Sequence, residues 1–556
     1  MPNYAILLLM NEIKNELKTT IKNLFNVDFE PELVVAPAEM GADFASNVAM
    51  KLAGILKSNP REIASKICAE FNGARVEIAG PGFLNFFLSD EYYLNKIFDY
   101  CENFDSSVKC DDYNGKTVIC EFSDPNPFKV LHVGHLYTSM VGDSIARLFE
   151  YAGAKVVRAN FGGDVGLHVG KTMWALLKSG MKDFTIEDIA AKYVDGTRAY
   201  EEDETAKAEI VEINKKVYEI AQNDLHDSEL AEMYWKGREL SYQYFEDFYG
   251  RIGVKFDKYY PESTVAGRGL AEVRKGLEQG VYEKSDGAVV YRGDTKLGLH
   301  TRVFINKEGL PTYEAKDVGL IFTKWDDYRF DKSVVITAND IIDYMKIVLG
   351  SVGEMNPELP ARTSHLTHGN VKLPGSVKMS SRKGNFLKAA DVLNMVSDEL
   401  HKNYNSEDFD IVLGATKYAF LKYKIGGDII FDPKESVKMT GNSGPYLLYS
   451  CVRAKNVLKR TRQSEVKVGE MNTFERVLIA KIAQYKDVLA EAVSEMAPHR
   501  IANYLFELAQ EFSRFYENCP VVGAENEGMR AKLVSCYLNV MTHGLNLMGI
   551  NIPETM

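Results

Sequence analysis

The sequence lacks any apolar run of the roughly 20 residues that a membrane-spanning helix needs. Its most hydrophobic early stretch, residues 5–10, is short and lacks both the basic start and the small-residue cleavage site of a secretory signal. We therefore expect a protein of the cytoplasm that has no membrane partner.

Cysteine is scarce as well. The seven cysteines include no Cys-x-x-Cys pair and no spacing with histidine of the kind that binds zinc. This pattern predicts neither a structural zinc site nor a disulfide framework, and we expect reduced, mostly buried thiols.

An excess of positive charge is also missing. The net charge of −12 at pH 7 argues against a protein that coats nucleic acid non-specifically, because phosphate binding relies on positive charge. A local basic face on this acidic chain stays open.

The length of 556 residues is too great for one hydrophobic core, and 46% hydrophobic with 26% charged residues is typical of a soluble globular protein. We predict a small α+β domain, an α/β domain and an all-α bundle, over residues 1–112, 113–388 and 389–556. The first contains helical runs and an alternating, strand-like stretch at 76–88. The last has apolar residues at helical spacing and few prolines.

The middle domain begins with a βαβ unit. Residues 117–122 are an apolar run of strand length, residues 134–151 have helical periodicity, and residues 155–161 form the next strand-like run. Such a unit builds a parallel sheet that binds ligands at the carboxyl ends of its strands. The sequence therefore predicts a Rossmann-like domain.

Two insertions interrupt this domain, near residues 171–248 and 262–312. The first is a charged helical stretch, which we interpret mainly as a solvated helix face. Strand-like runs at 288–292 and 333–338 indicate that the parallel sheet resumes after the interruption.

Two histidines lie between the first strand and the first helix of the βαβ unit. His132 and His135 are three residues apart at the helix start, where the helix dipole and free N–H groups favour phosphate. Gly134 removes a side chain where a nucleotide must approach the backbone. Two surface histidines or a metal pair are the alternatives, and a metal needs a third ligand that the sequence does not clearly offer.

A small basic loop forms the second signal, Lys378-Met-Ser-Ser-Arg-Lys-Gly-Asn385. Its lysines and flexible residues suit a mobile element that closes on phosphates and stabilises charge in a transition state. Taken alone, such a loop is as often a solvated turn.

Together the two signals resemble the paired signature loops of class I aminoacyl-tRNA synthetases. In that family the carboxylate of an amino acid attacks the α-phosphorus of Mg-ATP, and the protein mainly positions groups and neutralises charge. A ribose hydroxyl at the tRNA 3′ end then attacks the aminoacyl-adenylate. The ATP contacts that the resemblance implies are His132, Gly134, His135, Lys378, Met379, Ser380 and Ser381.

Three further segments, residues 121–126, 256–263 and 310–317, are similar to arginyl-tRNA synthetases, and the resemblance covers nearly the whole chain. A guanidinium is planar, permanently charged and rich in donors, so its site needs in-plane carboxylates and an aromatic or hydroxyl neighbour. The implied product is arginyl-tRNA(Arg), made through an arginyl-adenylate with release of AMP and pyrophosphate for translation. The arginine contacts that the resemblance implies are Asn126, Asp124, Glu262, Tyr313, Asp317 and Asp340.

Both ends of the chain resemble tRNA-binding domains of the same family. Phe83 and Asn85 lie in a segment similar to the domain that meets the corner of the tRNA, where Phe83 would stack on a base. Core packing of Phe83 in a strand is the alternative. Tyr449, Arg453 and Met556 lie in segments similar to the helical anticodon-binding domain. We expect a monomer that binds tRNA(Arg), L-arginine and ATP.

The sequence departs from the family pattern at three places. The second loop has Ser381 where most class I enzymes carry a lysine, and the resemblance assigns the missing charge to Lys129, with Lys383 as the rival. Asp124 stands where serine is common, and Asp340 where glutamine is common. The catalytic set implied in this way is His132, His135, Lys129, Lys378 and Lys383.

Three rival functions can be weighed from the sequence. A glutamate or glutamine enzyme would need basic residues in place of Glu262 and Asp317, and a cysteine enzyme should show zinc ligands. A catalytically silent RNA-binding paralogue would have lost His132, His135 or the basic loop, all of which are present. A small-molecule nucleotidyltransferase leaves both terminal regions without a purpose.

Overall fold

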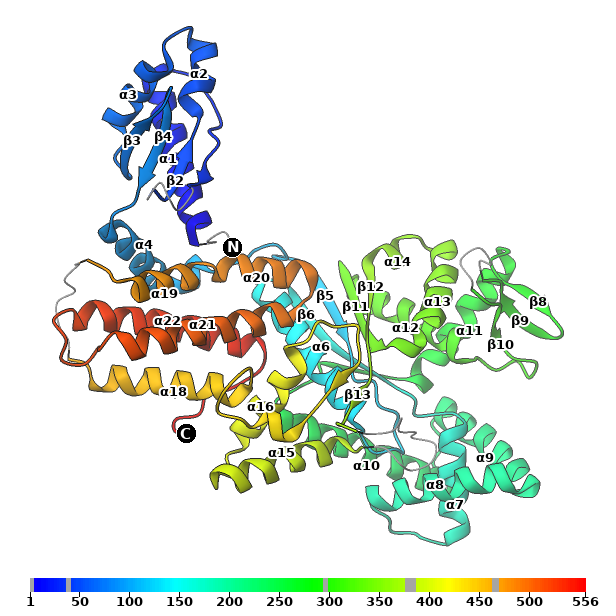
Figure 1. The fold of residues 1–556 in the computed structure, drawn as a ribbon. Helices are drawn as coiled ribbons and strands as arrows, with labels where there is room; N and C mark the ends of the chain where they lie inside the picture. Colours follow the sequence, from blue (N-terminus) through cyan, green and yellow to red (C-terminus); the bar gives the residue numbers. More distant parts are fainter. Residues whose placement is uncertain (1–4, 37–41, 294–298, 376–386, 463–469) are drawn as a thin grey trace.

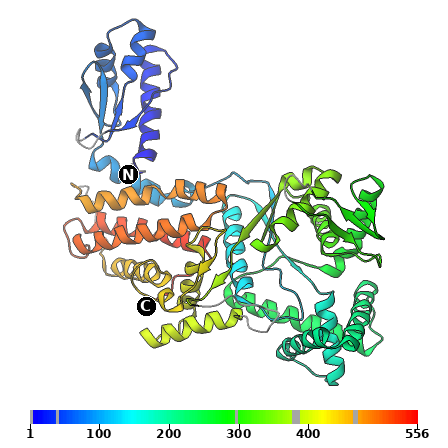
Figure 2. The ribbon, with the colours of Figure 1, turned by 45° about the vertical axis from the view of Figure 1, so that its right-hand side comes forward.

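A computed structural model describes residues 5–36, 42–293, 299–375, 387–462 and 470–556 (Figure 1). A small α+β domain projects from a body that consists of a parallel sheet with helices around it and a helical bundle. A view turned by 45° shows the same separation of the small domain from the body (Figure 2). The predicted α/β architecture, with a small N-terminal α+β part and a helical C-terminal part, is confirmed.

The N-terminal domain is an antiparallel four-stranded sheet in the order β1-β2-β4-β3. Its strands are β1 (Val34–Val35), β2 (Phe44–Ser46), β3 (Arg75–Ala79) and β4 (Phe83–Phe87), and its helices are α1 (Ala5–Phe25), α2 (Val48–Leu56) and α3 (Pro60–Glu70). Side chains alternate along β4, so Leu84 and Phe86 are buried while Phe83 faces solvent. Two helices, α4 (Asp90–Glu102) and α5 (Phe104–Ser107), then lead into the body.

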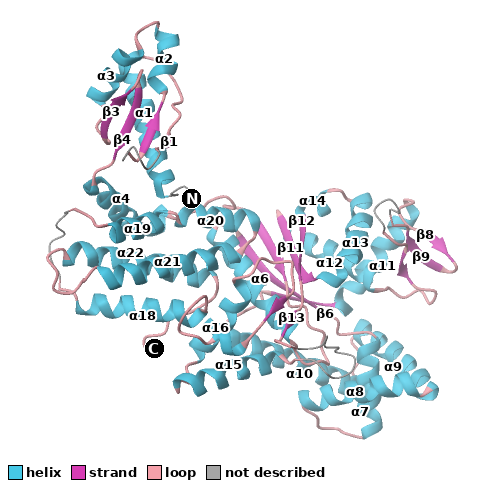
Figure 3. Cartoon of the chain, viewed as in Figure 1, coloured by secondary structure: helices cyan, strands magenta, loops and turns pink. Residues whose placement is uncertain are grey.

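Five parallel strands form the central sheet, in the order β12-β11-β5-β6-β7 (Figure 3). They are β5 (Thr117–Glu121), β6 (Lys155–Gly162), β7 (Lys258–Pro261), β11 (Lys332–Ala338) and β12 (Thr363–His368). Because both faces of the sheet are covered, successive residues of β5, including Val118 and Ile119, are buried. Strands β6 and β7 extend the sheet on one side of β5 and β11 and β12 on the other, which makes β5 the topological switch point where such sheets bind ligands.

Four helices fill the first insertion, α7 (Leu167–Ser179), α8 (Ile186–Glu202), α9 (Glu204–Asn223) and α10 (Glu229–Ile252). Many of their charged side chains face solvent, while Val169, Ile189 and Val217 pack into a core of their own. Phe128, from the loop after β5, lies in the same core. The insertion is therefore attached directly to the loop that carries the histidine motif.

The second insertion corrects one strand assignment. The run at 288–292 was expected in the parallel sheet, but β9 (Ala288–Tyr291) pairs antiparallel with β8 (Glu283–Ser285) and β10 (Arg302–Ile305) in a separate sheet. A short apolar run gives strand type but not the sheet to which the strand belongs. The run at 333–338 does lie in the parallel sheet, as β11.

Helices α11 (Glu262–Glu278) and α12 (Tyr313–Tyr328) pack closely against each other, followed by η3 (Asn339–Ile341), α13 (Ile342–Met355) and α14 (Glu358–Arg362). The crossing relies on two glycines. A Cβ at Gly269 would lie 2.0 Å from the Ala315 carbonyl oxygen, and a Cβ at Gly319 would lie 2.3 Å from the Val265 carbonyl oxygen. The absence of both side chains lets the two helix backbones touch.

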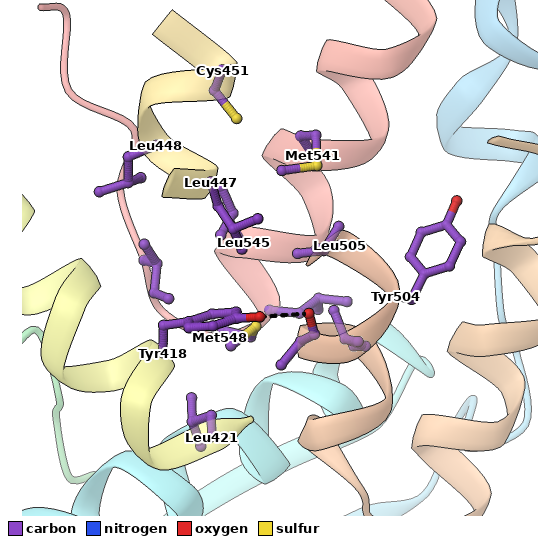
Figure 4. Close-up of a cluster of buried hydrophobic side chains, with 14 of the residues drawn as sticks. Tyr418, Leu421, Leu447, Leu448, Cys451, Tyr504, Leu505, Met541, Leu545 and Met548 are labelled. Carbon is purple, nitrogen blue, oxygen red and sulfur yellow. Dashed lines mark hydrogen bonds between the residues drawn. The ribbon is translucent and has the colours of Figure 1, made fainter. Parts of the chain in front are cut away.

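The helical bundle contains α15 (Ala389–Tyr404), α16 (Phe409–Leu421), α17 (Pro433–Ser436), α18 (Gly444–Arg460), α19 (Thr473–Ala483), α20 (Tyr485–Glu495), α21 (Pro498–Asn518) and α22 (Glu527–Leu547). Figure 4 shows its centre, where Leu448, Leu505 and Leu545 come from three different helices. The buried Tyr418 hydroxyl donates to the Ala502 carbonyl oxygen at 3.2 Å, which satisfies its polar atom inside the apolar core. A short parallel pair, β13 (Val371–Lys372) with β14 (Ile429–Ile430), interrupts the helical pattern.

The helix α6 (Val133–Tyr151), which crosses from β5 to β6, is bonded to the far end of the bundle. The Ser144 hydroxyl donates to the Leu547 carbonyl oxygen at 3.0 Å, and Arg147 Nη1 donates to the Asn546 carbonyl oxygen at 3.3 Å. These contacts fix the bundle against the same helix whose first turn carries the histidine pair. Within the bundle, the buried Lys417 ammonium of α16 donates to the Gly549 carbonyl oxygen at 2.6 Å, and burial lowers the pKa of Lys417 to about 8.

One expectation about cysteine is wrong. Cys101 of α4 and Cys536 of α22 form a disulfide, with their Cα atoms 5.4 Å apart and 435 residues apart in sequence. Sequence spacing could not show this contact, because it depends on how the N-terminal connection packs on the bundle. The other five thiols are free and are buried or half-buried.

Among the residues that the structure describes, no helix has the length and apolarity to cross a lipid bilayer.

The α11–α12 crossing gives a test of packing with a matched control on the same helix. We expect Gly269→Ala to lower the free energy of unfolding by about 1–3 kcal/mol, because the added methyl group overlaps a carbonyl oxygen. Gly267→Ala, which meets nothing within 4 Å, should instead be neutral or stabilise by up to about 1 kcal/mol. Urea and thermal unfolding followed by circular dichroism measure both. Equal effects of the two variants would contradict the close crossing.

Candidate active site

The carboxyl edge of the parallel sheet gathers the described residues that were predicted to bind ATP and arginine. The loop from Phe122 to His132 follows β5, Gly163 and Asp164 follow β6, and Glu262 follows β7 directly. Asp340 follows β11 on the other side of the switch point. Parallel strands bring these short segments to one side of the sheet, so residues more than 200 positions apart face a common region.

The two histidines cap helix α6 reciprocally. The His132 side chain accepts a hydrogen bond through Nδ1 from the Gly134 N–H at 3.1 Å, and His135 Nδ1 accepts one from the His132 N–H at 3.1 Å. The rings stack, with centroids 3.8 Å apart. Both Nδ1 atoms are thus acceptors, so a neutral ring in either position carries its proton on Nε2.

The surroundings keep these rings neutral. Burial, followed by the charge of Lys129, lowers the pKa of His132 to about 4. Burial also lowers the pKa of His135 well below its usual value, with His132 and Lys129 as further causes. The pair therefore offers two oriented N–H donors at a helix N-terminus without adding fixed positive charge.

Lys129 supplies positive charge close to the histidines. Its ammonium lies 4.7 Å from the centroid of the Tyr193 ring of α8. The same ammonium lowers the pKa values of His132, His135 and also His168. Lys129 thus lies between the histidine motif and the first insertion.

The basic loop with Lys378, Met379, Ser380, Ser381 and Lys383 lies outside the described residues. The chain immediately after it is described and pairs with the histidine motif. The Val133 N–H donates to the Leu387 carbonyl oxygen at 2.9 Å, and the Ala389 N–H donates to the Leu131 carbonyl oxygen at 3.0 Å. The downstream end of the loop segment is therefore fixed beside His132.

The loop after β5 has an unusual backbone. Ser123, Asp124 and Phe128 all have positive φ, at 72°, 48° and 66°. Non-glycine residues adopt this region rarely, and such strain concentrates at functional sites. Side-chain contacts hold it: the Ser123 hydroxyl bonds the Tyr249 hydroxyl at 2.8 Å, and the Asp124 carboxylate accepts from the Phe161 N–H at 2.8 Å.

Gly163 brings two predicted contacts together. Asn126 Oδ1 accepts a hydrogen bond from the Gly163 N–H at 2.9 Å. A Cβ at Gly163 would lie 2.5 Å from that Asn126 oxygen and 3.1 Å from Glu262 Oε1. Asn126 and Glu262 therefore meet over the backbone at this position, and any side chain there would occupy the space between them.

Glu262 already holds a positive partner. Its carboxylate lies 2.6 Å from the Lys316 ammonium, and both side chains are almost fully buried. The Tyr218 hydroxyl of α9 is 2.7 Å from the same ammonium. Burial raises the pKa of Glu262, and the charge of Lys316 opposes that rise. No sequence pattern predicts this buried lysine beside a residue that is expected to bind a guanidinium.

Among the described residues, Asp317 has no ion-pair partner. It accepts a hydrogen bond from the Tyr344 hydroxyl of α13, and burial raises its pKa to about 7. The Tyr344 hydrogen bond opposes that rise, and the nearby Glu121 adds to it. Tyr313, one turn earlier on α12, is 56% exposed and lies 5.0 Å from the Lys316 ammonium through its ring.

Two further ion pairs at this edge, each of which contains a buried acid, were not predicted. Asp164 is fully buried and accepts from the Ser263 hydroxyl at 2.6 Å and from Arg238 Nε at 2.9 Å. Glu121 lies 2.5 Å from the Lys324 ammonium. Asp164 carried a signal that sequence reasoning missed, because it follows a strand end and two glycines. Arg238 and Lys324 carried none, since they lie within regular helices.

The remaining predicted residues lie at the rim of this centre or away from it. Asp340 is exposed in η3. Phe83 is 41% exposed on β4, which contradicts core packing as its role. The Arg453 guanidinium lies 4.7 Å from the Tyr449 ring and 4.9 Å from the Tyr516 ring, so these three form a surface cluster on the bundle. Asn85 is half-buried beside Phe83, and Met556 packs against the bundle core.

Two further observations concern the described part of the chain. It contains no group of three or more histidine, cysteine or acidic side chains placed to hold a metal ion. A groove of about 510 Å³ between α7 and α9, lined by Trp174 and Ile213 among others, lies away from the residues described above.

Family models match three regions of the chain. Residues 104–431 match the catalytic domain of "tRNA synthetases class I (R)", residues 447–556 match the "DALR anticodon binding domain", and residues 11–88 match the "Arginyl tRNA synthetase N terminal domain". The first match alone covers more than half of the chain.

Relatives and solved structures are similar over nearly the full length. An arginine–tRNA ligase of Fusobacterium nucleatum is 29% identical over 98% of this chain and 99% of its own, and one of Treponema denticola is 29% identical over 90% of each. The fold resembles the Thermus thermophilus arginyl-tRNA synthetase, with a TM-score of 0.74 and 23% identity over 98% of this chain and 100% of the other. It also resembles the Plasmodium falciparum enzyme, with a TM-score of 0.70, 19% identity and coverage of 98% and 99%.

The burial of the histidine pair predicts that His132 titrates at a lower pH in the folded protein than in the unfolded chain. Because the folded pKa of His132 is about 4 and the usual value is 6.5, the unfolded chain takes up a proton first as pH falls. His132 therefore removes stability as pH drops from about 6.5 towards 4. NMR of histidine-labelled, ligand-free protein should show its ring neutral at pH 6, with the resonance assigned by its loss in His132→Asn. The urea-unfolded chain should titrate near the usual value, and a folded-state midpoint equal to it would contradict the buried cap.

Proposed function

The chain belongs to the class I arginyl-tRNA synthetases, and we propose that its active centre is the carboxyl edge of the five-stranded sheet around β5. The family charges tRNA(Arg) with arginine at the expense of ATP, and the protein is an arginine–tRNA ligase of this kind. The observation that carries the placement is the meeting of a neutral histidine pair, at a helix N-terminus, with buried carboxyl groups at one sheet edge.

We propose that ATP, as its Mg²⁺ complex, binds at the first turn of α6. Two Nε2–H donors from His132 and His135 would contact phosphate oxygens at the positive end of the α6 dipole, and Gly134 leaves room for the His132 ring that caps the helix. Lys129 would supply the positive charge that Ser381 lacks, because its ammonium already acts on both histidines. Lys378, Met379, Ser380 and Lys383 would join from the segment whose downstream end is fixed at Leu131 and Val133.

Arginine is proposed to lie between the loop after β5 and the start of α12. Asn126, held by the Gly163 N–H, would position the polar backbone of the amino acid. Asp317 would accept from the guanidinium and Tyr313 would cover it, since both lie in the first two turns of α12. Glu262, whose charge is balanced by Lys316, would line the wall of the site. Asp340 would lie at its rim.

For the tRNA we propose two distant contacts. The exposed Phe83 ring and the neighbouring Asn85 would meet unpaired bases, for which stacking on an aromatic ring with edge recognition is usual. The Tyr449–Arg453 cluster and Met556 would lie in the anticodon region, in agreement with the range of the anticodon-binding family model. In this proposal the predicted domains 1–112 and 389–556 contact the tRNA, and the predicted domain 113–388 binds ATP and arginine.

Several finer points belong to the same proposal. We propose that the enzyme works as a monomer in the cytoplasm and that ATP with Mg²⁺ enters as a substrate rather than as a resident cofactor. No structural zinc is part of the proposal, because the cysteine and histidine spacing offers no zinc ligand set.

Charging across all twenty amino acids tests the substrate. With ATP, Mg²⁺ and tRNA, we expect aminoacyl-tRNA to form with arginine, because the carboxyl groups at this edge suit a guanidinium. The tRNA must be present throughout, since adenylate formation in this family can require it. Charging with another amino acid and none with arginine would contradict the proposal.

One substitution can separate the proposed donor role of His132 from its role as the cap of helix α6. Asparagine at position 132 keeps a capping acceptor but has no Nε2–H, so His132→Asn should keep its melting temperature and lose about 10²- to 10³-fold in kcat. The KM for arginine should change little, because the proposed partner of the ring is phosphate. His401→Asn, an exposed histidine on α15, serves as the control with unchanged kcat. A loss of activity matched by a loss of stability would assign His132 a structural role only.

A further inference from the structure

The backbone that carries Lys129 is held on both sides of that residue. Phe128, which precedes it, is fully buried in the core of the first insertion, and its N–H donates to the Ser241 hydroxyl at 2.9 Å. On the other side, the Leu131 N–H donates to the Tyr244 hydroxyl at 3.3 Å. Ser241 and Tyr244 both belong to α10, so this helix fixes the place from which the Lys129 side chain extends.

The Lys129 ammonium contacts an aromatic ring. It lies 4.7 Å from the centroid of the Tyr193 ring. Among the residues that the structure describes, no carboxylate forms an ion pair with this ammonium. A carboxylate here would cancel the positive charge, whereas the negative face of an aromatic ring attracts a cation and leaves its charge intact. Tyr193 therefore holds the ammonium without neutralising it.

Tyr193 lies on a part of α8 that is itself fixed. Ile189, one turn earlier on the same face of α8, is buried in the core that also contains Phe128. About one turn after Tyr193, the backbone of α8 touches α7, because a Cβ at Gly196 would lie 2.1 Å from the Lys171 carbonyl oxygen. Tight packing on both sides of the half-buried Tyr193 thus sets the position of its ring.

We propose that Tyr193 is a positioning residue for adenylate formation, which holds the Lys129 ammonium on its ring and so directs it towards the first turn of α6. The inference rests on the proposed function, in which Lys129 supplies positive charge to the phosphates of ATP, and it deepens that function. The loop that carries Lys129 continues directly into this turn. A free lysine side chain loses much rotamer freedom when it is ordered. A ring that restricts the ammonium beforehand lowers this entropic cost when ATP binds.

A second tyrosine of α8 provides a matched control. The Tyr200 ring lies 4.5 Å from the Lys171 ammonium and 5.9 Å from the Lys207 ammonium. These two lysines belong to the insertion itself, in α7 and α9. Tyr200 therefore makes the same kind of contact on the same helix, but with lysines that have no part in the proposed ATP site.

Charging kinetics of the full chain test the proposal. Tyr193→Leu removes the aromatic face and keeps an apolar side chain, so kcat should fall by about 2- to 30-fold, the range that corresponds to one cation–π contact. KM for arginine should change little, because the proposed partner of Lys129 is phosphate. Tyr193→Phe restores a ring and should keep kcat within about twofold. Tyr200→Leu should leave kcat unchanged.

A double-mutant cycle separates positioning from a structural role. Lys129→Met removes the charge and keeps much of the apolar stem, and it should lower kcat more than Tyr193→Leu does. In the Lys129→Met background, Tyr193→Leu should have no further effect, because no ammonium is left to position. An equal loss of kcat in both backgrounds would overturn the proposal and assign Tyr193 to the packing of the insertion.

The titration of His132 gives a readout that does not depend on catalysis. The charge of Lys129, after burial, lowers the pKa of this ring, so an ammonium released from Tyr193 should let that pKa rise. We expect a rise in Tyr193→Leu and in Lys129→Met, and none in Tyr193→Phe or Tyr200→Leu. NMR of histidine-labelled, ligand-free protein measures it. If Tyr193→Leu is unstable, Tyr193→Met provides the same comparison without a ring.

The possible failures are distinguishable. If Lys129→Met keeps its kcat, the proposed role of Lys129 is wrong and the proposal for Tyr193 is overturned with it. If Lys129→Met loses activity while Tyr193→Leu keeps both kcat and the His132 titration of the wild type, the role of Tyr193 alone is overturned and the proposed function stands. A lower kcat of Tyr193→Leu with an unshifted His132 titration would also overturn it, because the ammonium would not have moved.

Discussion

The Lys316 ammonium lies 2.6 Å from the Glu262 carboxylate inside the protein, and this buried pair constrains the site around it. Taking two charges out of water is costly, so the pair persists only where further hydrogen bonds complete its shell. Tyr218, from the first insertion, supplies one of them. The pair also requires α11 and α12 to cross at backbone contact, which the glycines at 269 and 319 permit. Insertion, helix crossing and site geometry therefore depend on one another.

Helix α6 connects the proposed active centre with the C-terminal end of the bundle. Its first turn is capped by the histidine pair, and its later turns donate to carbonyl oxygens at the end of the bundle through Ser144 and Arg147. Asp143 joins Arg147 and the buried Arg158 in the same region. A helix bonded at both ends moves as one body, so a displacement of the bundle would reach the histidines without intermediate loops.

Sequence reasoning located the parts that depend on local pattern. The βαβ unit, the position of the histidine pair at the start of its helix and the strand at 333–338 follow from periodicity and strand-end position, and each lies where it was expected. The reciprocal cap that the two rings form was not predicted. What the sequence could not show are contacts between distant segments. The sheet to which residues 288–291 belong, the Cys101–Cys536 bond and the partners Lys316 and Arg238 all depend on tertiary packing. A lysine within a helix has the same local signature whether it is solvated or paired with a buried acid.

Charge is distributed differently on the two sides of the proposed active centre. On the side proposed for phosphate the histidines stay neutral because burial and the charge of Lys129 lower their pKa values, so positive charge there would come from lysine. On the side proposed for arginine, Glu121, Glu262 and Asp164 each have an ion-pair partner in the described part of the chain. Asp317 has none there, and burial raises its pKa to about 7, so a cation that binds beside it favours its charged form. We therefore expect a neutral side chain of the same shape to bind less well, because it cannot stabilise the charged form of this buried carboxyl.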